Sequence, residues 1–473
     1  MKQLLQTILS GILAVALVLT SAPGTALAEE NIPASTDWPE PPDISSTAAV
    51  VMEASTGSIL YNKAAYDSFY PASTTKLMTA LLAIEQCPLS DIVTCSYDAI
   101  HSIGSDSSHI GLTVGESIDM ENALYAILLA SANEVSYAVA EHIGTTTDRF
   151  VTMMNERAAE LGCVNTHFSN PHGLDDPEHY SSPYDLALIA KKAIEYTTFR
   201  RISGSYYHQI PATNKNVARD IGNTHQIIRK RIACEGVFAG KTGSTSQAGN
   251  CLVTCAERDG MTLICVIMKA PDSTTVYNDT IALLDYAFEN FSLTPITATG
   301  TETKNAFPVL FEDEEALIAD VSSPLTVSDT SLVLPRGASY SDLTKEFTLI
   351  PSVSFTTGEN IIGEVSYYYA DNYVGSAEIL YHSATDVVIQ PSPTPIPEGA
   401  TPDISAAVNT SGANLTGTSD PDGAKNTEAD TDLRPVIIGI IAGAVVLAAG
   451  LYLVVVEIPY QKKKKAYYRK HPR

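Results

Sequence analysis

The sequence predicts an exported α+β protein followed by a small all-β domain, a flexible stalk and a single membrane span. Three observations lead to this prediction. Strand-like segments at 47–63 and 249–270 enclose a stretch of helical periodicity. Short strand-like pieces follow residue 296. Residues 436–456 form an uncharged, predominantly apolar run.

The N-terminus has the layout of a secretory signal peptide. Lys2 provides positive charge, residues 4–19 are apolar, and the tripeptide ALA at 26–28 forms a small-x-small cleavage site. We therefore predict a signal peptide over residues 1–28. A retained N-terminal anchor is the alternative.

The C-terminus carries a second membrane signal. As a helix, residues 436–456 would extend about 30 Å, which is enough to cross a bilayer. The tail at 457–473 is rich in lysine, and clustered basic residues stay on the cytoplasmic side. The expected topology is an outer body, one transmembrane helix and a short cytoplasmic tail.

Charge and cysteine content narrow the possible functions. The chain has a formal net charge of −25 and no basic patch with interleaved aromatic residues, which argues against nucleic-acid binding. Its 7 cysteines leave at least one unpaired. Cys251, Cys255 and Cys265 lie in apolar strand-like runs and are expected to be small buried hydrophobes. A disulfide between Cys87 and Cys95 across a short loop is possible on sequence grounds.

The outer body begins with two short strands around a turn within 47–63, and helical periodicity starts at Ser73. A tripeptide at 258–260 (RDG) predicts a hairpin between two later strands. The other expected helices are at 122–130, 135–143, 182–194 and 281–291.

The character of the chain changes near residue 296. Short strand-like pieces separated by Gly, Pro and Asn predict a small β-rich domain over 297–390. Residues 391–434 contain almost no large apolar side chain, so they cannot bury a core and are predicted to form a flexible stalk.

Ser73 and Lys76 form the first candidate for chemistry. They lie three residues apart where a helix is predicted to begin, so their side chains share one face. A serine hydroxyl is a poor nucleophile unless a base removes its proton. Lysine can be that base only when it is neutral, which requires burial or a neighbouring cation. A lysine on an exposed helix face is the alternative.

Two further tripeptides strengthen this hypothesis. SAN at 131–133 interrupts a helical pattern, where a loop could present side chains to a cleft. KTG at 241–243 precedes a hairpin strand. Lys241 could hold a substrate carboxylate and help to keep Lys76 neutral, and Gly243 would allow close backbone approach.

The motifs SxxK, SxN and KTG, in this order, are those of penicillin-recognising serine enzymes. Residues 45–290 resemble low-molecular-mass D-alanyl-D-alanine carboxypeptidases of the S11 serine peptidase type. The segments that carry the resemblance are YPASTTKLMTALLAIE, LLASANEVSYAVAEHI, NPHGLDDPEHYSSPYDLALIAKKAI and GVFAGKTGSTSQAGNCLVTCAERDGMTLICVIM. The segment GEVSYYYADNYVGSAEILY looks more loosely like that family's C-terminal domain.

The resemblance implies a catalytic domain over 45–292 with an antiparallel sheet packed with helices, beside a helical region, as in serine β-lactamases and penicillin-binding proteins. It implies that Ser73 attacks the D-Ala–D-Ala carbonyl and becomes the acyl-enzyme. Lys76 would accept the serine proton, and Ser131 would relay a proton to the leaving D-alanine.

The other implied residues bind substrate. Asn133 would hold the substrate amide, and Lys241 with Thr242 would bind the terminal carboxylate. Gly243 would let the backbone approach, and the N–H groups of the nucleophile and of Ser244 would form an oxyanion hole. Water then releases the shortened peptide, and the resemblance implies no metal or cofactor.

The expected partners are the stem peptide of peptidoglycan as substrate, β-lactam antibiotics as covalent inhibitors, and the membrane. Three alternatives remain open at the level of sequence. A β-lactamase and a D,D-endopeptidase would use the same residues, and a non-catalytic wall-binding protein would use none of them.

Some positions depart from the family pattern. Glu134 stands where aspartate is usual, Phe238 and Ala239 precede Gly240 where Asp-Gly and an aliphatic residue are commoner, and NTH at 223–225 replaces an Asn-x-Asn turn. These departures concern the rim of the cleft and hence rate or preference.

Two other clusters have simpler explanations than metal binding. His167, His172 and His179 lie within one loop, where hydrogen-bonded or exposed roles are expected. The acidic run at 311–315 is expected to be a solvated surface.

Overall fold

The computed structural model describes residues 38–104, 106–296, 325–350, 354–383 and 387–388. The predicted signal peptide, stalk, membrane span and basic tail all lie outside these residues, as does the acidic run at 311–315. Within the part that is described, no helix is both long and apolar enough to cross a bilayer.

A five-stranded sheet in the order β2-β1-β9-β8-β7 is the centre of the fold, and every neighbouring pair is antiparallel. Its strands are β1 (Ala48–Glu53), β2 (Ile59–Lys63), β7 (Val237–Thr245), β8 (Gly249–Arg258) and β9 (Met261–Ala270). The predicted hairpin joins β8 to β9, and Asp259 and Gly260 both have positive φ, as a tight right-twisting hairpin requires. The expected antiparallel sheet is confirmed.

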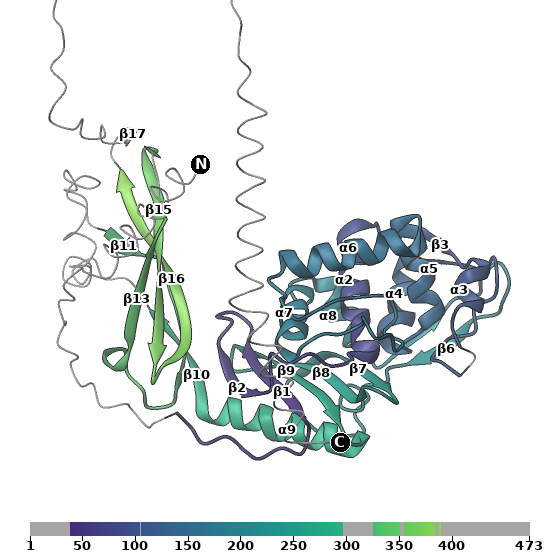
Figure 1. Cartoon of the computed structure of the whole chain (residues 1–473), viewed down its shortest axis with the longest axis horizontal. Helices are drawn as coiled ribbons and strands as arrows, with labels where there is room; N and C mark the ends of the chain where they lie inside the picture. Colours follow the sequence, from purple (N-terminus) through teal and green to yellow (C-terminus); the bar gives the residue numbers. More distant parts are fainter. Residues whose placement is uncertain (1–37, 105, 297–324, 351–353, 384–386, 389–473) are drawn as a thin grey trace, which may run out of the picture. The chain divides into compact units, whose positions relative to one another are not determined.

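Both faces of the sheet are covered, which explains why its strands are apolar almost throughout. Alternate residues of a strand point to opposite faces. In β9 one face carries Ile264, Val266 and Met268, and the other carries Leu263, Cys265 and Ile267. Helix α9 (Ser273–Asn290) packs on the second face, and the remaining helices gather on the first (Figure 1).

The helical region surrounds one central helix, α2 (Lys76–Gln86), which contacts α4, α5, α6, α7 and α8. The elements in this region are α3 (Tyr97–His101), α4 (Met120–Leu129), α5 (Asn133–Gly144), α6 (Thr147–Glu160), α7 (Pro183–Ala193), α8 (Thr197–Ser203), with the strand pairs β3 (Ile92–Thr94)–β4 (Ser117–Asp119) and β5 (Tyr207–Ile210)–β6 (Arg219–Gly222). Residues Lys76–Ala83 of α2 are buried, so Lys76 and Thr79 face protein rather than water, whereas Gln86 at the end of the helix is exposed. The helices predicted at 122–130, 135–143 and 182–194 are confirmed with small shifts of their ends, whereas the helix predicted at 281–291 begins two turns earlier, at Ser273.

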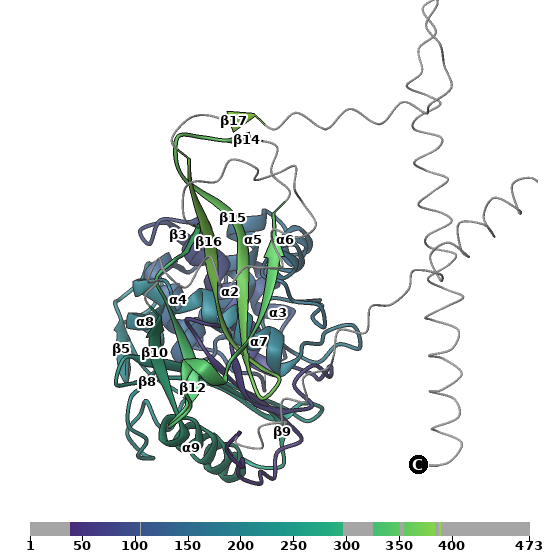
Figure 2. The same cartoon turned by 90° about the vertical axis from the view of Figure 1, so that its left-hand side faces the viewer.

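The β-rich part forms a four-stranded antiparallel sheet in the order β11-β16-β15-β13. Its strands are β11 (Leu325–Val327), β13 (Thr344–Leu349), β15 (Gly358–Tyr369) and β16 (Asn372–Ser383), and a short pair is formed by β14 (Ser354–Phe355) and β17 (Val387–Val388). The long β15–β16 ribbon is seen side-on in Figure 2.

A two-stranded ribbon connects the core of the five-stranded sheet with the core of the β-rich part. β10 (Phe291–Ile296) pairs with β12 (Thr330–Pro335). In β12, Val333 joins the core between the five-stranded sheet and α9, whereas Leu332 and Leu334 join the core of the β-rich part. Alternation along a single strand therefore places its side chains in two hydrophobic cores.

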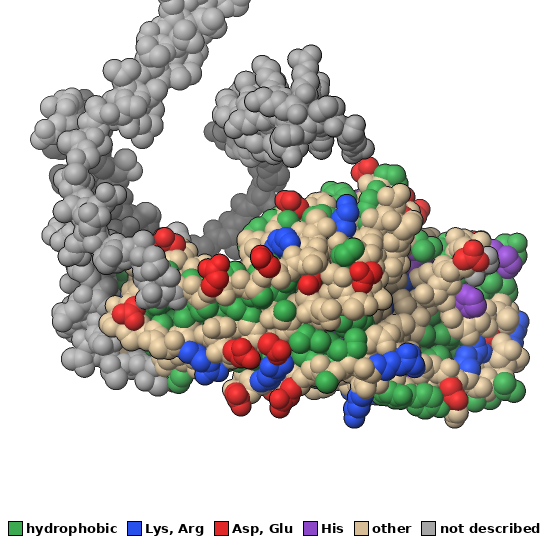
Figure 3. All heavy atoms as spheres, turned by 90° about the horizontal axis from the view of Figure 1, so that it is seen from below, with side chains coloured by type: hydrophobic (Ala, Val, Ile, Leu, Met, Phe, Trp, Pro, Cys, Tyr) green, Lys and Arg blue, Asp and Glu red, His purple; other side chains and the backbone are tan. Residues whose placement is uncertain are grey.

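The cysteines of the sheet strands, Cys251, Cys255 and Cys265, are buried, as predicted. All seven cysteines are free thiols, so Cys87 and Cys95 do not form the disulfide considered above. On the face shown in Figure 3, acidic and basic side chains are interspersed rather than separated by sign.

Candidate active site

Three segments that are far apart in the sequence meet at one end of the sheet. They are a 3₁₀ turn (η1, Ala72–Thr75) that runs into α2, the junction between α4 and α5, and strand β7. The turn contacts β7 directly. These segments carry the SxxK, SxN and KTG motifs, so the structure brings the three predicted motifs together.

Ser73 lies in the 3₁₀ turn and Lys76 is the first residue of α2, a small correction to the expected α-helical start. The 3₁₀ geometry favours the pair, because residues i and i+3 eclipse in such a turn. The Lys76 amine lies 2.9 Å from the Ser73 hydroxyl oxygen. Lys76 is fully buried, so the exposed-lysine alternative is wrong.

The surroundings of Lys76 determine how its nitrogen can interact with Ser73. The amine donates to the Asn133 side-chain oxygen at 2.6 Å and to the His172 backbone carbonyl at 2.5 Å. A neutral amine has two N–H groups and one lone pair. With both N–H groups engaged by these two oxygens, the lone pair is left for the Ser73 O–H.

The environment of the Lys76 amine favours its uncharged form. Burial lowers the pKa of Lys76 well below its ordinary value of 10.5, and the nearby Lys241 lowers it further. The Glu134 carboxylate acts in the opposite direction and raises that pKa. Burial is the largest of these effects and favours the uncharged amine, as a general base requires.

Ser131 lies between the helices with a strained backbone. Its φ of 61° is in the left-handed region, which costs a non-glycine residue on the order of 1 kcal/mol. Its hydroxyl oxygen accepts a hydrogen bond of 3.1 Å from the Lys241 amine. Ala72, just before the nucleophile, has a similar φ of 48°. Such strain clusters at functional sites.

Lys241 is as buried as Lys76, with 1% of its surface exposed. Burial lowers its pKa to about 7. Besides Ser131, its amine donates to the Thr242 carbonyl at 2.8 Å. Near neutrality Lys241 is therefore only partly charged, and an incoming carboxylate would favour its protonated form.

Strand β7 is the edge strand of the five-stranded sheet, and the turn that carries the nucleophile packs beside it. A Cβ on Gly243 would lie 3.1 Å from the Ser73 backbone nitrogen and 3.0 Å from the Pro71 carbonyl, so the strand passes directly beside the Ser73 N–H. Ser244, next along, is exposed. Thr242 exchanges a hydrogen bond of 2.7 Å with Thr224.

The loop at 169–174 packs against the turn that carries the nucleophile. Gly173 has a φ of 85°, and a Cβ there would lie 1.9 Å from the Ala72 carbonyl oxygen. Only glycine fits this position. The close packing places the His172 carbonyl on the Lys76 amine.

The loop histidines have structural partners. His179 exchanges a hydrogen bond of 2.7 Å with the Thr75 hydroxyl and accepts one of 2.9 Å from the Ser169 backbone N–H. His167 contacts the Glu178 carbonyl. Burial lowers the pKa values of His172 and His179 to about 3, so both rings are neutral.

Comparison with known proteins agrees with this geometry. The profile of the Peptidase_S11 family, described as D-alanyl-D-alanine carboxypeptidase, matches residues 35–272. The chain belongs to this family. It is accordingly a serine-type hydrolase with the penicillin-binding-protein-like α+β fold.

Individual S11 relatives extend the similarity. The chain is 32% identical over 359 residues to the D-alanyl-D-alanine carboxypeptidase DacF from Bacillus subtilis, covering 75% of this chain and 87% of that protein. The structure of penicillin binding protein 5 from Haemophilus influenzae matches with a TM-score of 0.59 at 26% identity, covering 73% of this chain and 98% of that one. The Streptomyces K15 DD-transpeptidase matches with a TM-score of 0.50 at 29% identity, covering 53% and 100%.

Some residues of the site could not be singled out from sequence. The contact of His172 with Lys76 runs through its backbone carbonyl, so no side-chain pattern reveals it. Thr224 belongs to the NTH departure, and its contact with Thr242 depends on tertiary packing. In the same turn, His225 fills the space beside Gly240 and hydrogen-bonds Thr254.

Proposed function

We propose that this chain removes the terminal D-alanine from peptidoglycan stem pentapeptides through an acyl-enzyme on Ser73, and that penicillins acylate the same residue. The observation that carries the proposal is the buried Lys76 amine, 2.9 Å from the Ser73 oxygen, with its N–H groups engaged by Asn133 and His172.

Substrate binding uses the edge of the sheet. The peptide pairs with β7 as an added strand, an arrangement that the position of β7 at the edge of the sheet supports. Its terminal carboxylate meets Lys241 and Thr242, and Asn133 holds the amide before the scissile bond. The scissile carbonyl then lies over Ser73.

Acylation has two steps, attack on the carbonyl and loss of D-alanine, and each step transfers one proton. The Ser73 oxygen attacks the carbonyl carbon while the Lys76 nitrogen takes its proton, and the N–H groups of Ser73 and Ser244 hold the resulting oxyanion. As the C–N bond breaks, Ser131 passes a proton to the leaving D-alanine nitrogen, and Lys76 restores it. Water then attacks the ester carbonyl, one proton of that water passes through Lys76 to the Ser73 oxygen as the ester C–O bond breaks, and the shortened peptide leaves as the free acid.

The direct test is D-alanine release from a pentapeptide ending in D-Ala–D-Ala, together with covalent labelling by a fluorescent penicillin. The parent chain should do both, and Ser73→Ala should do neither. Labelled Ser73→Ala would reject the nucleophile. Labelling without D-alanine release, with rapid turnover of penicillin, would favour the β-lactamase alternative. Cleavage of cross-linked dimers in preference to pentapeptide would favour an endopeptidase.

We also propose that the enzyme acts outside the membrane. The apolar run at 436–456, followed by the basic tail, supports a C-terminal anchor with the tail in the cytoplasm. Protease added to intact cells should degrade the catalytic part and spare an epitope on the tail. Degradation of both, or of neither, would contradict this topology.

A further inference from the structure

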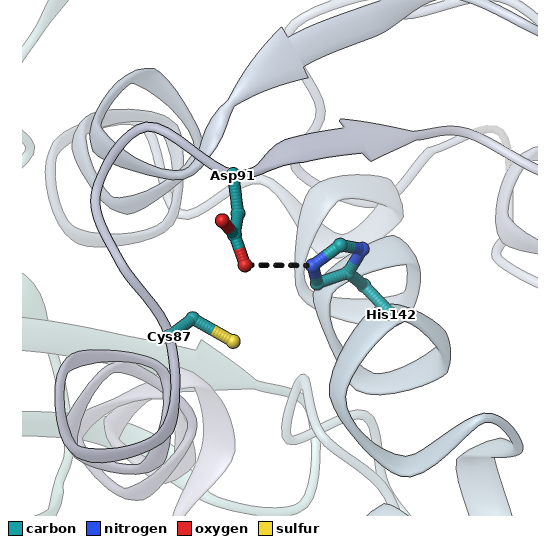
Figure 4. Close-up of side chains that lie close together, drawn as sticks. All are labelled: Cys87, Asp91 and His142. Carbon is teal, nitrogen blue, oxygen red and sulfur yellow. Dashed lines mark ion pairs between the residues drawn. The ribbon is translucent and has the colours of Figure 1, made fainter.

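A cysteine, an aspartate and a histidine meet at the far end of the helical region, away from the proposed catalytic residues. Cys87 is the residue that ends α2, Asp91 lies just before β3, and His142 lies in the last turn of α5. Their side chains point toward one another (Figure 4). The proposed reaction uses none of them.

The three ligand atoms are spaced as for a small metal ion. The Cys87 sulfur, an Asp91 oxygen and a His142 nitrogen all lie within 4.8 Å of one another, and the His142 Nε2 is 3.6 Å from the Asp91 Oδ2. Zinc bonds of about 2.0–2.3 Å at tetrahedral angles place ligand atoms about 3.4–3.6 Å apart. Small side-chain rotations would bring the set to this spacing.

The backbone already holds two of these residues in place. The Cys87 N–H donates to the Ala83 carbonyl at 3.2 Å, which closes the end of α2. The Asp91 N–H donates to Pro88 at 3.1 Å, and the Asp91 carbonyl accepts from Met120 at 2.8 Å. The loop that carries both residues therefore needs little ordering to bind an ion.

Two simpler readings of this cluster explain less. The ion pair between His142 and Asp91, whose side chains are 30% and 38% exposed, contributes little stability. It also does not account for the Cys87 thiol beside it. A reactive cysteine would be more accessible than Cys87, which is half-buried at the end of α2. A soft sulfur, an imidazole and a carboxylate together are a set that zinc accepts.

We propose that Cys87, Asp91 and His142 form a zinc-binding site, with a water molecule as the fourth ligand. Binding would form Zn–S, Zn–N and Zn–O bonds and release the thiol proton to solvent, with no change of oxidation state. Mg²⁺ and Ca²⁺ prefer sets made of oxygen alone and are not expected to bind.

The position of the site suggests what the ion would do. Helix α2 begins with Lys76, and α5 begins with Asn133, the two residues joined by the 2.6 Å hydrogen bond. Both helices end at the cluster, about 14–17 Å away at 1.5 Å per residue. Zinc would fasten these two helices at the ends opposite to the reaction. The proposal does not depend on the proposed carboxypeptidase activity.

The test uses the full chain, purified with chelator and then dialysed against zinc. We expect a single zinc ion per chain, and with Co²⁺ the absorption of a thiolate–cobalt bond. Cys87→Ser and His142→Ala should each weaken binding at least about tenfold. Cys234→Ser is the matched control, because it removes another half-buried thiol outside the cluster and should bind zinc as the parent does.

Thermal unfolding provides a second readout. Zinc at 100 times its Kd should raise the Tm of the parent by about 5 °C and leave that of Cys87→Ser unchanged. Penicillin labelling of each zinc-free variant confirms that it is folded. Two results would overturn the proposal. One is zinc binding that both Cys87→Ser and His142→Ala retain. The other is a parent chain that penicillin labels but that does not bind zinc at 100 µM, which is about the weakest affinity we would accept for a site.

Discussion

The two buried lysines of the site, Lys76 and Lys241, need opposite protonation states for the proposed reaction. Lys76 must be neutral to accept a proton, and burial next to Lys241 lowers its pKa. Lys241 must be positive to hold a carboxylate, and burial lowers its pKa to about 7. The proposed reaction needs one amine without its proton and the other with it, so it is confined to a window of pH.

The kcat/KM for D-alanine release should therefore follow a bell-shaped pH profile. The rate rises as Lys76 loses its proton, and it falls above about pH 7 as Lys241 loses its own. In Lys241→Arg the guanidinium stays charged, so the alkaline limb should disappear even if the maximum rate drops. The exposed Lys269→Arg serves as the control and should keep both limbs. An alkaline limb near pH 7 in Lys241→Arg would show that Lys241 is not its source.

Glu134 adjusts the same balance from a buried position. Its charge raises the pKa of Lys76. Glu134→Gln should thus move the acid limb of penicillin acylation to lower pH, by about one unit. Glu141→Gln, on the same helix but half-exposed, should leave the limb in place. An identical acid limb in both variants would mean that Glu134 does not act on Lys76.

At the scale of elements, the site depends on a loop packed against the turn that carries the nucleophile. Gly173 makes the closest contact, since its Cα approaches the Ala72 carbonyl more nearly than any side chain would allow. The contact is distant in sequence, and it is the means by which the loop carbonyl at 172 reaches the Lys76 amine.

Gly173→Ala should therefore lose stability and activity together. The new Cβ clashes with backbone and the φ of 85° is strained, so we expect a loss of at least about 2 kcal/mol in urea unfolding. Gly162→Ala is the matched control: it has a similar φ of 83° but nothing within 4 Å, so it should cost only about 1 kcal/mol. Equal losses in the two variants would show that the contact with Ala72 is unimportant.

At the scale of the molecule, the catalytic part buries several histidines as neutral rings. Burial lowers the pKa values of His172, His179 and His225 to about 3, against an ordinary value of 6.5. Between these values the unfolded chain binds protons that the folded chain cannot. Stability is then fully present above pH 6.5 and is lost as the pH falls toward 3.

Each buried imidazole should remove about 1.4 kcal/mol of stability per pH unit in this window, so the three together give a slope of about 4 kcal/mol per unit. Urea unfolding at intervals between pH 6.5 and 4.5 measures the slope. His225→Asn should reduce it by about a third, and His101→Ala, which removes an exposed ring, should not change it. A flat dependence in the parent would contradict the burial of neutral imidazoles.

Local patterns were enough to predict much of this molecule. The spacing of apolar residues indicated α2, α4, α5, α7 and the second part of α9, and the RDG turn indicated the β8–β9 hairpin, because both depend on neighbours in the chain. Helices α3, α6 and α8 were not predicted. The three motifs contained every candidate residue except Ser244, which came from the family resemblance. The sequence also predicted that Ser73 and Lys76 share a face, because residues three apart lie on the same side of both a 3₁₀ and an α-helical turn.

The tertiary structure decided how these residues act. Whether Lys76 was exposed or buried depended on five helices packing around α2, and no local pattern contains that information. Three other features also depend on segments that are distant in the sequence. They are the hydrogen bond from Lys76 to the His172 carbonyl, the position of β7 at the edge of the sheet, and the cluster of Cys87, Asp91 and His142. Sequence determined which groups are available, but proximity and desolvation set their protonation and partners, and these arise only when the chain is folded.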